Sequence, residues 1–449
     1  MTEKKKAAKK ERSKAKEKAS HKAKPKEKHA KAQDKKIQAA GGKPGQEAKA
    51  AKGEACQADI NIGMVGHVDH GKTSLTQALT GKWTDTHSEE LKRGISIRLG
   101  YADVVFYKCQ NCRGAEAYTN REICPTCGKK AKRARKVSFV DAPGHETLMT
   151  TMLSGAALMD GAVLVIAANE ECPQPQTEEH LMALKMAGIE KLVVAQNKVD
   201  LVERNKALES KKQISSFLEQ NGYKNIPIIP IAANFSGNID LLIEAVEEHI
   251  PTPKFELEKP LLMYCARSFD INKPGTKADS LKGGVVGGTI IQGKAKTGEK
   301  ILIRPGLEGQ EIESEITSLS CSSGILKEAV PGGLVAIGTG LDSSLTQNDR
   351  MRGQVVGTKK SLPESTTELN VEINYIKRLV ASIEPEIKSN EPVVLTIGTM
   401  AAVGTVTSIS GKKAKIVLKN KVVVLPGQKI AVSKKATGRW QLVAYAIAE

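Results

Sequence analysis

The stretch from Gly66 to Thr73 reads GHVDHGKT and matches the pattern Gly-x-x-x-x-Gly-Lys-Thr. Two glycines at this spacing let the backbone wrap a polyphosphate, so that several N–H groups point at it. Lys72 adds a positive charge, and the Thr73 hydroxyl is placed to bind magnesium. The apolar run INIGMV precedes the loop and SLTQAL follows it. This order of strand, loop and helix predicts a phosphate-binding loop.

A second motif, DAPGHE, begins at Asp141 after the apolar run VSFV. An acidic residue at the end of a buried strand beside a phosphate loop suits an outer-shell magnesium partner. Gly144 has no side chain to keep its N–H from a γ-phosphate. We expect His145 to begin a helix and to orient an attacking water, although a lone histidine is more often structural.

The third motif, NKVD from Asn197 to Asp200, follows the apolar run KLVVAQ. The Asp200 carboxylate can accept hydrogen bonds from N1–H and the 2-amino group of guanine, and adenine offers neither group at that edge. The Lys198 stem can lie over the base, and Asn197 can tie this loop to the phosphate loop. Three motifs in this order predict a GTPase. Between the first two lies HSEELKRGISI, in which the Ser96 hydroxyl is a candidate switch ligand for magnesium.

Four cysteines, Cys109, Cys112, Cys124 and Cys127, form two CxxC pairs that are eleven residues apart. Four thiolates can close a tetrahedral structural zinc site. Disulfides are the competing interpretation, and a reducing compartment disfavours them. The segment is too poor in apolar residues to fold alone, so we expect the metal to hold it together, in contact with protein or RNA.

The positive charge is concentrated in a tail. The chain of 449 residues carries a net charge of +18, of which residues 1–55 supply +12, with 19 basic and 7 acidic residues. We expect this tail to be disordered, either simply solvated or in contact with RNA. No stretch has the roughly 18 uninterrupted apolar residues of a membrane span, and no secretory signal is evident. We therefore expect a cytoplasmic protein without a membrane partner.

From residue 58 to 255, apolar strands alternate with helices, a pattern typical of an α/β domain with a mostly parallel sheet. After Pro260, short strands separated by glycine, proline and aspartate indicate antiparallel β-barrels. The predicted parts are a tail (1–57), a GTP-binding domain (58–255) with a zinc knuckle (107–136), and two barrels (259–365 and 366–449). A single large sandwich is the alternative for the last two parts.

These motifs, together with RSFDINKPG and GGVVGGTIIQG, make the chain resemble the gamma subunit of archaeal translation initiation factor 2. The resemblance implies alpha and beta subunits as partners and delivery of methionyl initiator tRNA to the small ribosomal subunit. It implies Mg²⁺ at Thr73 and Ser96, zinc at the four cysteines, and a second cation near Asp69 and the Gly94 carbonyl. The implied GTP contacts are Asp69, His70, Gly71, Lys72, Thr73, Ser74, Asn197, Lys198, Val199, Asp200, Ala232, Ala233 and Asn234.

Two positions depart from the family pattern. Ser96 replaces the switch threonine, and Ala232-Ala233-Asn234 replaces Ser-Ala-Leu in the guanine loop. We expect a looser switch, because serine lacks the methyl group that restricts the threonine rotamer. Another aminoacyl-tRNA-carrying GTPase, either an elongation factor or a selenocysteine-specific factor, is the nearest rival. A non-catalytic scaffold that binds RNA is a rival of another class.

Overall fold

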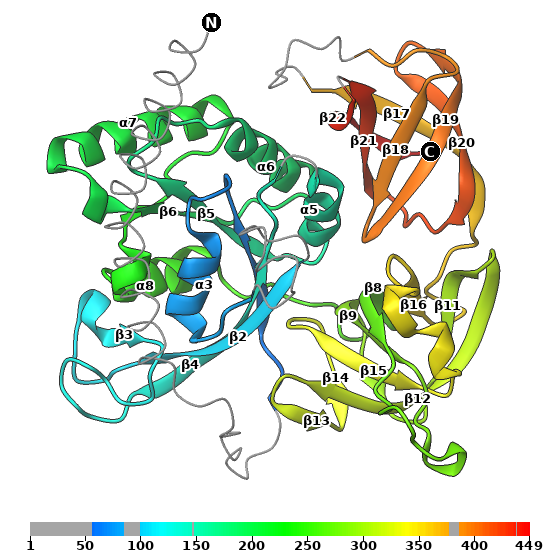
Figure 1. The fold of residues 1–449 in the computed structure, drawn as a ribbon, viewed down its shortest axis with the longest axis horizontal. Helices are drawn as coiled ribbons and strands as arrows, with labels where there is room; N and C mark the ends of the chain where they lie inside the picture. Colours follow the sequence, from blue (N-terminus) through cyan, green and yellow to red (C-terminus); the bar gives the residue numbers. More distant parts are fainter. Residues whose placement is uncertain (1–55, 85–98, 146–147, 377–385, 437) are drawn as a thin grey trace, which may run out of the picture. The chain divides into compact units, whose positions relative to one another are not determined.

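The computed structural model describes residues 56–449, apart from 85–98, 146–147, 377–385 and 437 (Figure 1). The expectations for the tail up to residue 55, for Gly94 and for Ser96 lie outside the described residues.

The first domain is built on a seven-stranded sheet of order β3-β2-β4-β1-β5-β6-β7. From β4 to β7 the strands are parallel, whereas β2 is antiparallel to both β4 and β3. Every residue of β1, β5 and β6 is buried, as expected where both faces of a sheet are covered. The strands are β1 (Ile60–Val65), β2 (Gly100–Lys108), β3 (Tyr118–Thr119), β4 (Lys132–Asp141), β5 (Gly161–Ala167), β6 (Leu192–Asn197) and β7 (Ile228–Pro230).

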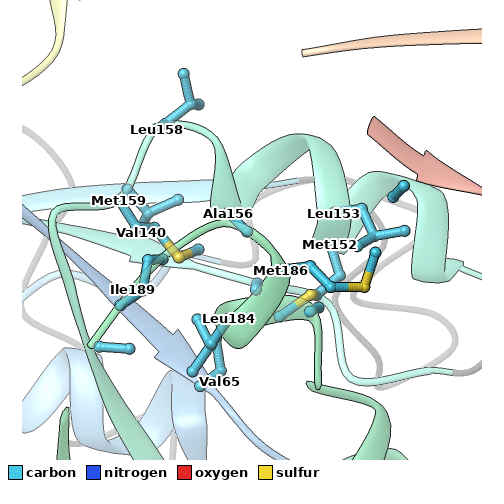
Figure 2. Packing of buried hydrophobic residues seen from close by; sticks show 14 of the residues in the cluster. Val65, Val140, Met152, Leu153, Ala156, Leu158, Met159, Leu184, Met186 and Ile189 are labelled. Carbon is cyan, nitrogen blue, oxygen red and sulfur yellow. The ribbon is translucent and has the colours of Figure 1, made fainter. Parts of the chain in front are cut away.

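Helices cover both faces of this sheet (Figure 1). Helices α3 and α8 pack on one face, and α5, α6 and α7 on the other. Figure 2 shows the second of these layers, where Leu184 of α6 lies near Val65 and Met152 of α5 lies near Met186 of α6. The helices are α3 (Lys72–Thr80), α5 (Met149–Ala156), α6 (Pro175–Met186), α7 (Arg204–Gln220) and α8 (Ile239–His249). The predicted mostly parallel α/β domain is confirmed.

The apolar face of α8 differs from the one that the sequence suggests. Leu241, Ile243, Val246 and Ile250 look like its buried stripe, but Leu241 is 37% exposed. The buried positions include Ile239, Leu242, Ile243 and Val246, which repeat at intervals of three and four residues. Leu241 therefore lies outside the buried stripe of α8, which begins at Ile239.

Two antiparallel barrels follow, as predicted, rather than one sandwich. In the first, β11 pairs with both β16 and β12 and so closes the sheet. Its strands are β8 (Leu262–Phe269), β9 (Val285–Gln292), β11 (Lys300–Leu307), β12 (Gln310–Cys321), β13 (Gly324–Leu326), β15 (Val335–Thr339) and β16 (Val355–Gly357), with the short pair β10 (Ala295–Lys296) and β14 (Glu328–Ala329) beside them.

The last barrel is closed in the order β17-β20-β19-β18-β21-β22. Buried and exposed residues alternate along β19 and much of β20, as in a strand with one face toward a barrel core. The strands are β17 (Thr366–Tyr375), β18 (Pro392–Ile397), β19 (Met400–Ser410), β20 (Lys413–Val422), β21 (Lys429–Ala436) and β22 (Arg439–Ala448). Among the described residues, no helix has the length and apolar character needed to cross a membrane.

Candidate functional site

The phosphate loop lies between β1 and α3, as its sequence predicts. Asp69 and Gly71 have positive φ angles of 60° and 92°. A Cβ atom at Gly71 would lie 2.3 Å from Asn197 Nδ2, so a side chain there would displace the neighbouring loop. Glycine at this position therefore serves both the turn and the close approach of Asn197.

Lys72 lies at the first position of α3 and is 6% exposed. Its Nζ donates hydrogen bonds to Gly66 O at 2.9 Å and His67 O at 2.7 Å. A Cβ atom at Gly144 would lie 2.5 Å from this Nζ and 3.0 Å from Val68 N, so a side chain there would displace the lysine ammonium group. The ends of β1 and β4 thus converge on one ammonium group.

Thr73 and Asp141 lie in contact on the same side of the loop. Thr73 Oγ1 donates to Asp141 Oδ2 at 2.9 Å, and Thr84 Oγ1 donates to the same oxygen at 2.6 Å. Asp141 is 1% exposed. A hydroxyl and a carboxylate are hard oxygen donors of the kind that Mg²⁺ prefers. Thr84 was not predicted from the sequence.

Asn197 at the end of β6 joins three loops. Its Nδ2 donates to His70 O at 2.9 Å, and its Oδ1 accepts the Ala233 N–H at 3.0 Å. Lys198 next to it has a φ of 61°, which turns the chain into the short helix η3 (Val199–Leu201). The predicted tie between the guanine loop and the phosphate loop is thus present in the structure.

One pocket brings most of the predicted residues together. Of the residues expected to bind GTP, His70, Val199 and Ala232 are not part of the lining. Val68 and Trp83 also line it, although no sequence motif predicts them, and Trp83 is 44% exposed. The lining residues are Val68, Asp69, Gly71, Lys72, Thr73, Ser74, Trp83, Gly144, His145, Asn197, Lys198, Asp200, Ala233 and Asn234.

His145 lines the pocket, directly before residues 146–147, which lie outside the described part of the chain. The helix α5 begins at Met149, and His145 O accepts the Leu148 N–H at 2.9 Å. The expected helix start at His145 stays a prediction, because residues 146–147 lie outside the described residues. The role of His145 toward water stays a prediction.

Two buried histidines help to hold the phosphate loop: His180 lies on α6, and His70 belongs to the loop itself. His180 of α6 accepts the Gly66 N–H at its Nδ1, at 2.9 Å, and burial lowers its pKa well below the usual value. His70 is fully buried between Val165 O and Glu170, and burial lowers its pKa to about 4, although Glu170 opposes the shift. Both imidazoles are thus neutral near pH 7. Sequence reasoning missed His180, which lies 114 residues from Gly66.

The four cysteines converge at the far end of the β2–β4 hairpin. Their Sγ atoms all lie within 4.8 Å of one another, with Cys109 and Cys127 at 3.4 Å and Cys112 and Cys124 at 3.8 Å. None is in a disulfide. Four thiolates bonded to zinc at about 2.3 Å would lie roughly 3.8 Å apart in a tetrahedron, so this set fits a structural zinc ion.

Backbone N–H groups favour thiolate at two of the four cysteines, Cys109 and Cys124, whereas burial raises the pKa of Cys112. The Asn111 N–H donates to Cys109 Sγ at 3.4 Å and is the main reason why the pKa of Cys109 is lowered to about 6. The pKa of Cys124 is lowered chiefly by the backbone N–H of Cys127. These donors serve the charged form of sulfur that binds a metal.

The knuckle is attached to the same helix that carries the phosphate loop. Asn120 Nδ2 donates to Ala78 O at 3.1 Å and Leu79 O at 2.8 Å, in the last turn of α3. Gly81 ends this helix with a φ of 73°. The asparagine thus satisfies carbonyl groups that a helix end leaves without partners.

Curated relatives match nearly the whole chain. It is 54% identical over 403 residues to translation initiation factor 2 subunit gamma of Methanococcus aeolicus, covering 87% of this chain and 98% of that one. The subunit of the same name from Pyrococcus furiosus is 50% identical, with coverage of 87% and 97%. This chain belongs to the gamma subunit family of translation initiation factor 2.

Family models agree along the chain. Residues 57–252 match the elongation factor Tu GTP binding domain, 283–357 match elongation factor Tu domain 2, and 367–448 match the C-terminal domain of initiation factor eIF2 gamma. The first domain of this gamma subunit family member is thus a GTPase domain, and the protein is a translation initiation GTPase.

Solved structures share the fold. A bacterial selenocysteine-specific elongation factor matches with a TM-score of 0.69 at 24% identity, covering 88% of this chain and 58% of that one. Translation elongation factor SelB from Methanococcus maripaludis, in complex with a GTP analogue, matches with a TM-score of 0.65 at 21% identity, with coverage of 88% and 80%. At these identities the likeness concerns the fold alone.

Proposed function

We propose that this gamma subunit family member binds methionyl initiator tRNA in its GTP form and delivers it to the small ribosomal subunit, with alpha and beta subunits as partners. GTP hydrolysis would act as the release switch, and the protein would work in the cytoplasm, where ribosomes initiate. The observation that carries this proposal is identity of about half to initiation factor gamma subunits over 87% of the chain.

The pocket supports the nucleotide part of this proposal. Backbone N–H groups from Asp69 to Ser74 would surround the phosphates, and Lys72 would offset their charge. Asp200 would accept hydrogen bonds from guanine, while Lys198 would cover the base. Ala233 can still donate its N–H at the guanine oxygen, but the loop lacks the serine hydroxyl at Ala232. We therefore expect selectivity for guanine with somewhat weaker binding.

The oxygen donors support a magnesium ion beside Thr73. Thr73 Oγ1 would bind the ion directly, and Asp141 would accept hydrogen bonds from its water ligands. Ser96 would join when the γ-phosphate is bound. The ion would neutralise charge on the phosphates. A second cation near Asp69 and the Gly94 carbonyl stays a proposal that rests on the family resemblance.

Hydrolysis is expected to be slow in the isolated protein. Lys72 offsets charge on the γ-phosphate, the Gly144 N–H approaches it, and His145 orients the attacking water. GTPases without an arginine supplied by a partner turn over at about 10⁻⁴ s⁻¹. The nucleotide would therefore act as a timed switch, and the ribosomal complex would accelerate its hydrolysis.

Four thiolates support a structural zinc ion, with Cys109, Cys112, Cys124 and Cys127 as its ligands. Because all four positions would be filled by protein, the ion would have no open position for substrate chemistry.

The test compares the affinity of the full chain for methionyl initiator tRNA and methionyl elongator tRNA, each with GTP and with GDP. The proposal predicts tight binding only to the initiator and only with GTP. Equal binding of both tRNAs would indicate an elongator instead. Binding that is indifferent to the nucleotide would indicate a scaffold.

A further inference from the structure

The zinc knuckle carries more positive charge for its size than the rest of residues 56–449. Residues 107–136 hold nine lysines or arginines and two acidic residues, a net charge of +7. The whole of residues 56–449 carries +6, so the remainder outside the knuckle is close to neutral, at −1. A 30-residue module thus accounts for the net charge outside the tail.

Several of these cations have structural partners. Arg135 pairs with Glu247 at 2.6 Å, Lys136 with Asp103 at 3.1 Å, and Lys130 with Glu122 at 2.8 Å. Lys108 donates to Tyr118, and Lys129 to Asn111. Arg133 lies 3.6 Å from Asp59. These six contribute to the fold and to local charge.

Three cations remain available to a ligand. Arg113, Arg121 and Lys132 are exposed, and within the described residues none has a side-chain hydrogen bond or an ion pair. Each lies within five residues of a cysteine of the cluster, at Cys112, Cys124 and Cys127 respectively. Because the four sulfur atoms lie within 4.8 Å of one another, the three cations belong to one small module.

Another basic region behaves differently. In the last barrel, Lys412, Lys413, Lys415 and Lys434 lie within 4 Å of Glu372, Glu449, Glu368 and Glu391 respectively. Ion pairing of this kind leaves less charge for a polyanion. The unpaired cations of the knuckle are therefore better suited to bind an external polyanion than the paired lysines of the last barrel.

The knuckle is also separate from the nucleotide pocket. Asn120 attaches it to the last turn of α3, and the phosphate loop ends at the first turn. A helix of nine residues spans about 13 Å, so a ligand on the knuckle does not compete with nucleotide.

We propose that the zinc knuckle is a second RNA-contacting surface, which binds the phosphate backbone of RNA through Arg113, Arg121 and Lys132. Arginine offers a planar fork of donors that matches a phosphate, and lysine adds a point charge. Ile123 is the only large apolar side chain that is markedly exposed on the described knuckle, which disfavours a protein partner that needs an apolar centre. Binding is independent of base sequence and of bound nucleotide.

The test uses the full chain and a triple variant, Arg113→Gln, Arg121→Gln and Lys132→Gln. The matched control replaces three exposed lysines on α7, as Lys206→Gln, Lys211→Gln and Lys212→Gln. Affinity for a labelled RNA duplex of arbitrary sequence is measured between about 50 and 200 mM salt. The tail is present in every protein, so its contribution cancels in the comparison.

Each lost phosphate contact lowers the salt dependence of log K by about 0.7 to 0.9. The knuckle variant is expected to lose about 2 to 3 units of slope, and the control variant much less. Zinc content and GTP affinity should stay at wild-type values, which shows that the knuckle is folded. Parallel titrations with deacylated tRNA and with small ribosomal subunits distinguish the source: a loss confined to one of them identifies that RNA as the ligand.

An unchanged slope in the knuckle variant, or an equal loss in the α7 control, would overturn the proposal. These outcomes are independent of initiator tRNA delivery, which is judged by the difference between GTP and GDP.

Discussion

The two ends of helix α3 are stabilised by different chemistry. At its first turn, the phosphate loop is held by backbone turns, by the tightly packed glycines Gly71 and Gly144, and by the buried His180. At its last turn, the knuckle has three buried members in its own described apolar cluster, Cys109, Cys124 and Ala131, and four converging thiols. The first end depends on the core of the domain, whereas the second would depend on the proposed zinc ion in addition to the core contacts of Ala117 and Tyr118.

The largest expected effect concerns the metal end. Cys124→Ser should lose zinc and make residues 107–136 sensitive to trypsin, because zinc binding supplies about 10–16 kcal/mol in peptides of this kind. GTP affinity should change less than about threefold, since the loop end has its own core. Zinc content, proteolysis and nucleotide titration check this. Cys172→Ser, outside the knuckle, is the control and should keep its zinc.

The next effect concerns the loop end. Lys72→Ala removes a buried ammonium that would pair with phosphate, and charged hydrogen bonds contribute about 1.5–3 kcal/mol each. GTP affinity should fall by at least about 100-fold with zinc content unchanged. Lys206→Ala on α7 should leave both values at wild-type levels. Loss of zinc in the Lys72 variant would show that the two ends are not independent.

Sequence patterns predicted the residues of the phosphate loop and its neighbouring motifs better than the residues that hold these motifs in place. The glycine spacing, Asp141 and Asn197 are local motifs at strand ends, so their convergence follows from a parallel sheet. His180 and Thr84 lie far from any motif, and only the packing of α6 and the turn after α3 places them. The spacing of the cysteines predicted their cluster, but nothing in it indicated that Asn120 would bind the end of α3.

We expect a moderate effect on GTP binding when His180 is replaced, because its neutral imidazole accepts the Gly66 N–H. His180→Ala leaves the Gly66 N–H buried without its acceptor, which costs about 1–3 kcal/mol and should weaken GTP binding roughly 5- to 100-fold. His180→Asn supplies an oxygen acceptor and should recover part of that loss. If alanine and asparagine behave alike, the hydrogen bond is not what matters.

The same residue carries a pH dependence. Its pKa is lowered in the folded state, so the unfolded chain binds the proton more readily. Stability should therefore be fully present above the unfolded value of about 6.5 and fall as the pH drops below it. Urea unfolding at pH 7.5 and pH 5 should show a smaller loss for His180→Asn than for the wild type. An equal or larger loss would contradict the assignment.

The smallest effect concerns the link between the two ends. Asn120→Ala removes two hydrogen bonds to the last turn of α3 and should lower the free energy of unfolding by about 1–2 kcal/mol. Asn111→Ala, at an exposed knuckle position, should change it much less. Chemical denaturation with zinc present measures both. Similar values for the two variants would indicate that the link does not stabilise the domain.

We propose that guanine recognition in this pocket controls initiator tRNA binding. Asp200→Asn replaces an acceptor by an amide that can donate to the O2 of xanthine, where guanine carries an amine. The most direct measurement is the affinity of this variant for methionyl initiator tRNA with GTP and with xanthosine triphosphate. The account predicts tight binding with xanthosine triphosphate and weak binding with GTP. Binding that stays at the wild-type level with GTP, or that ignores the nucleotide, would contradict it.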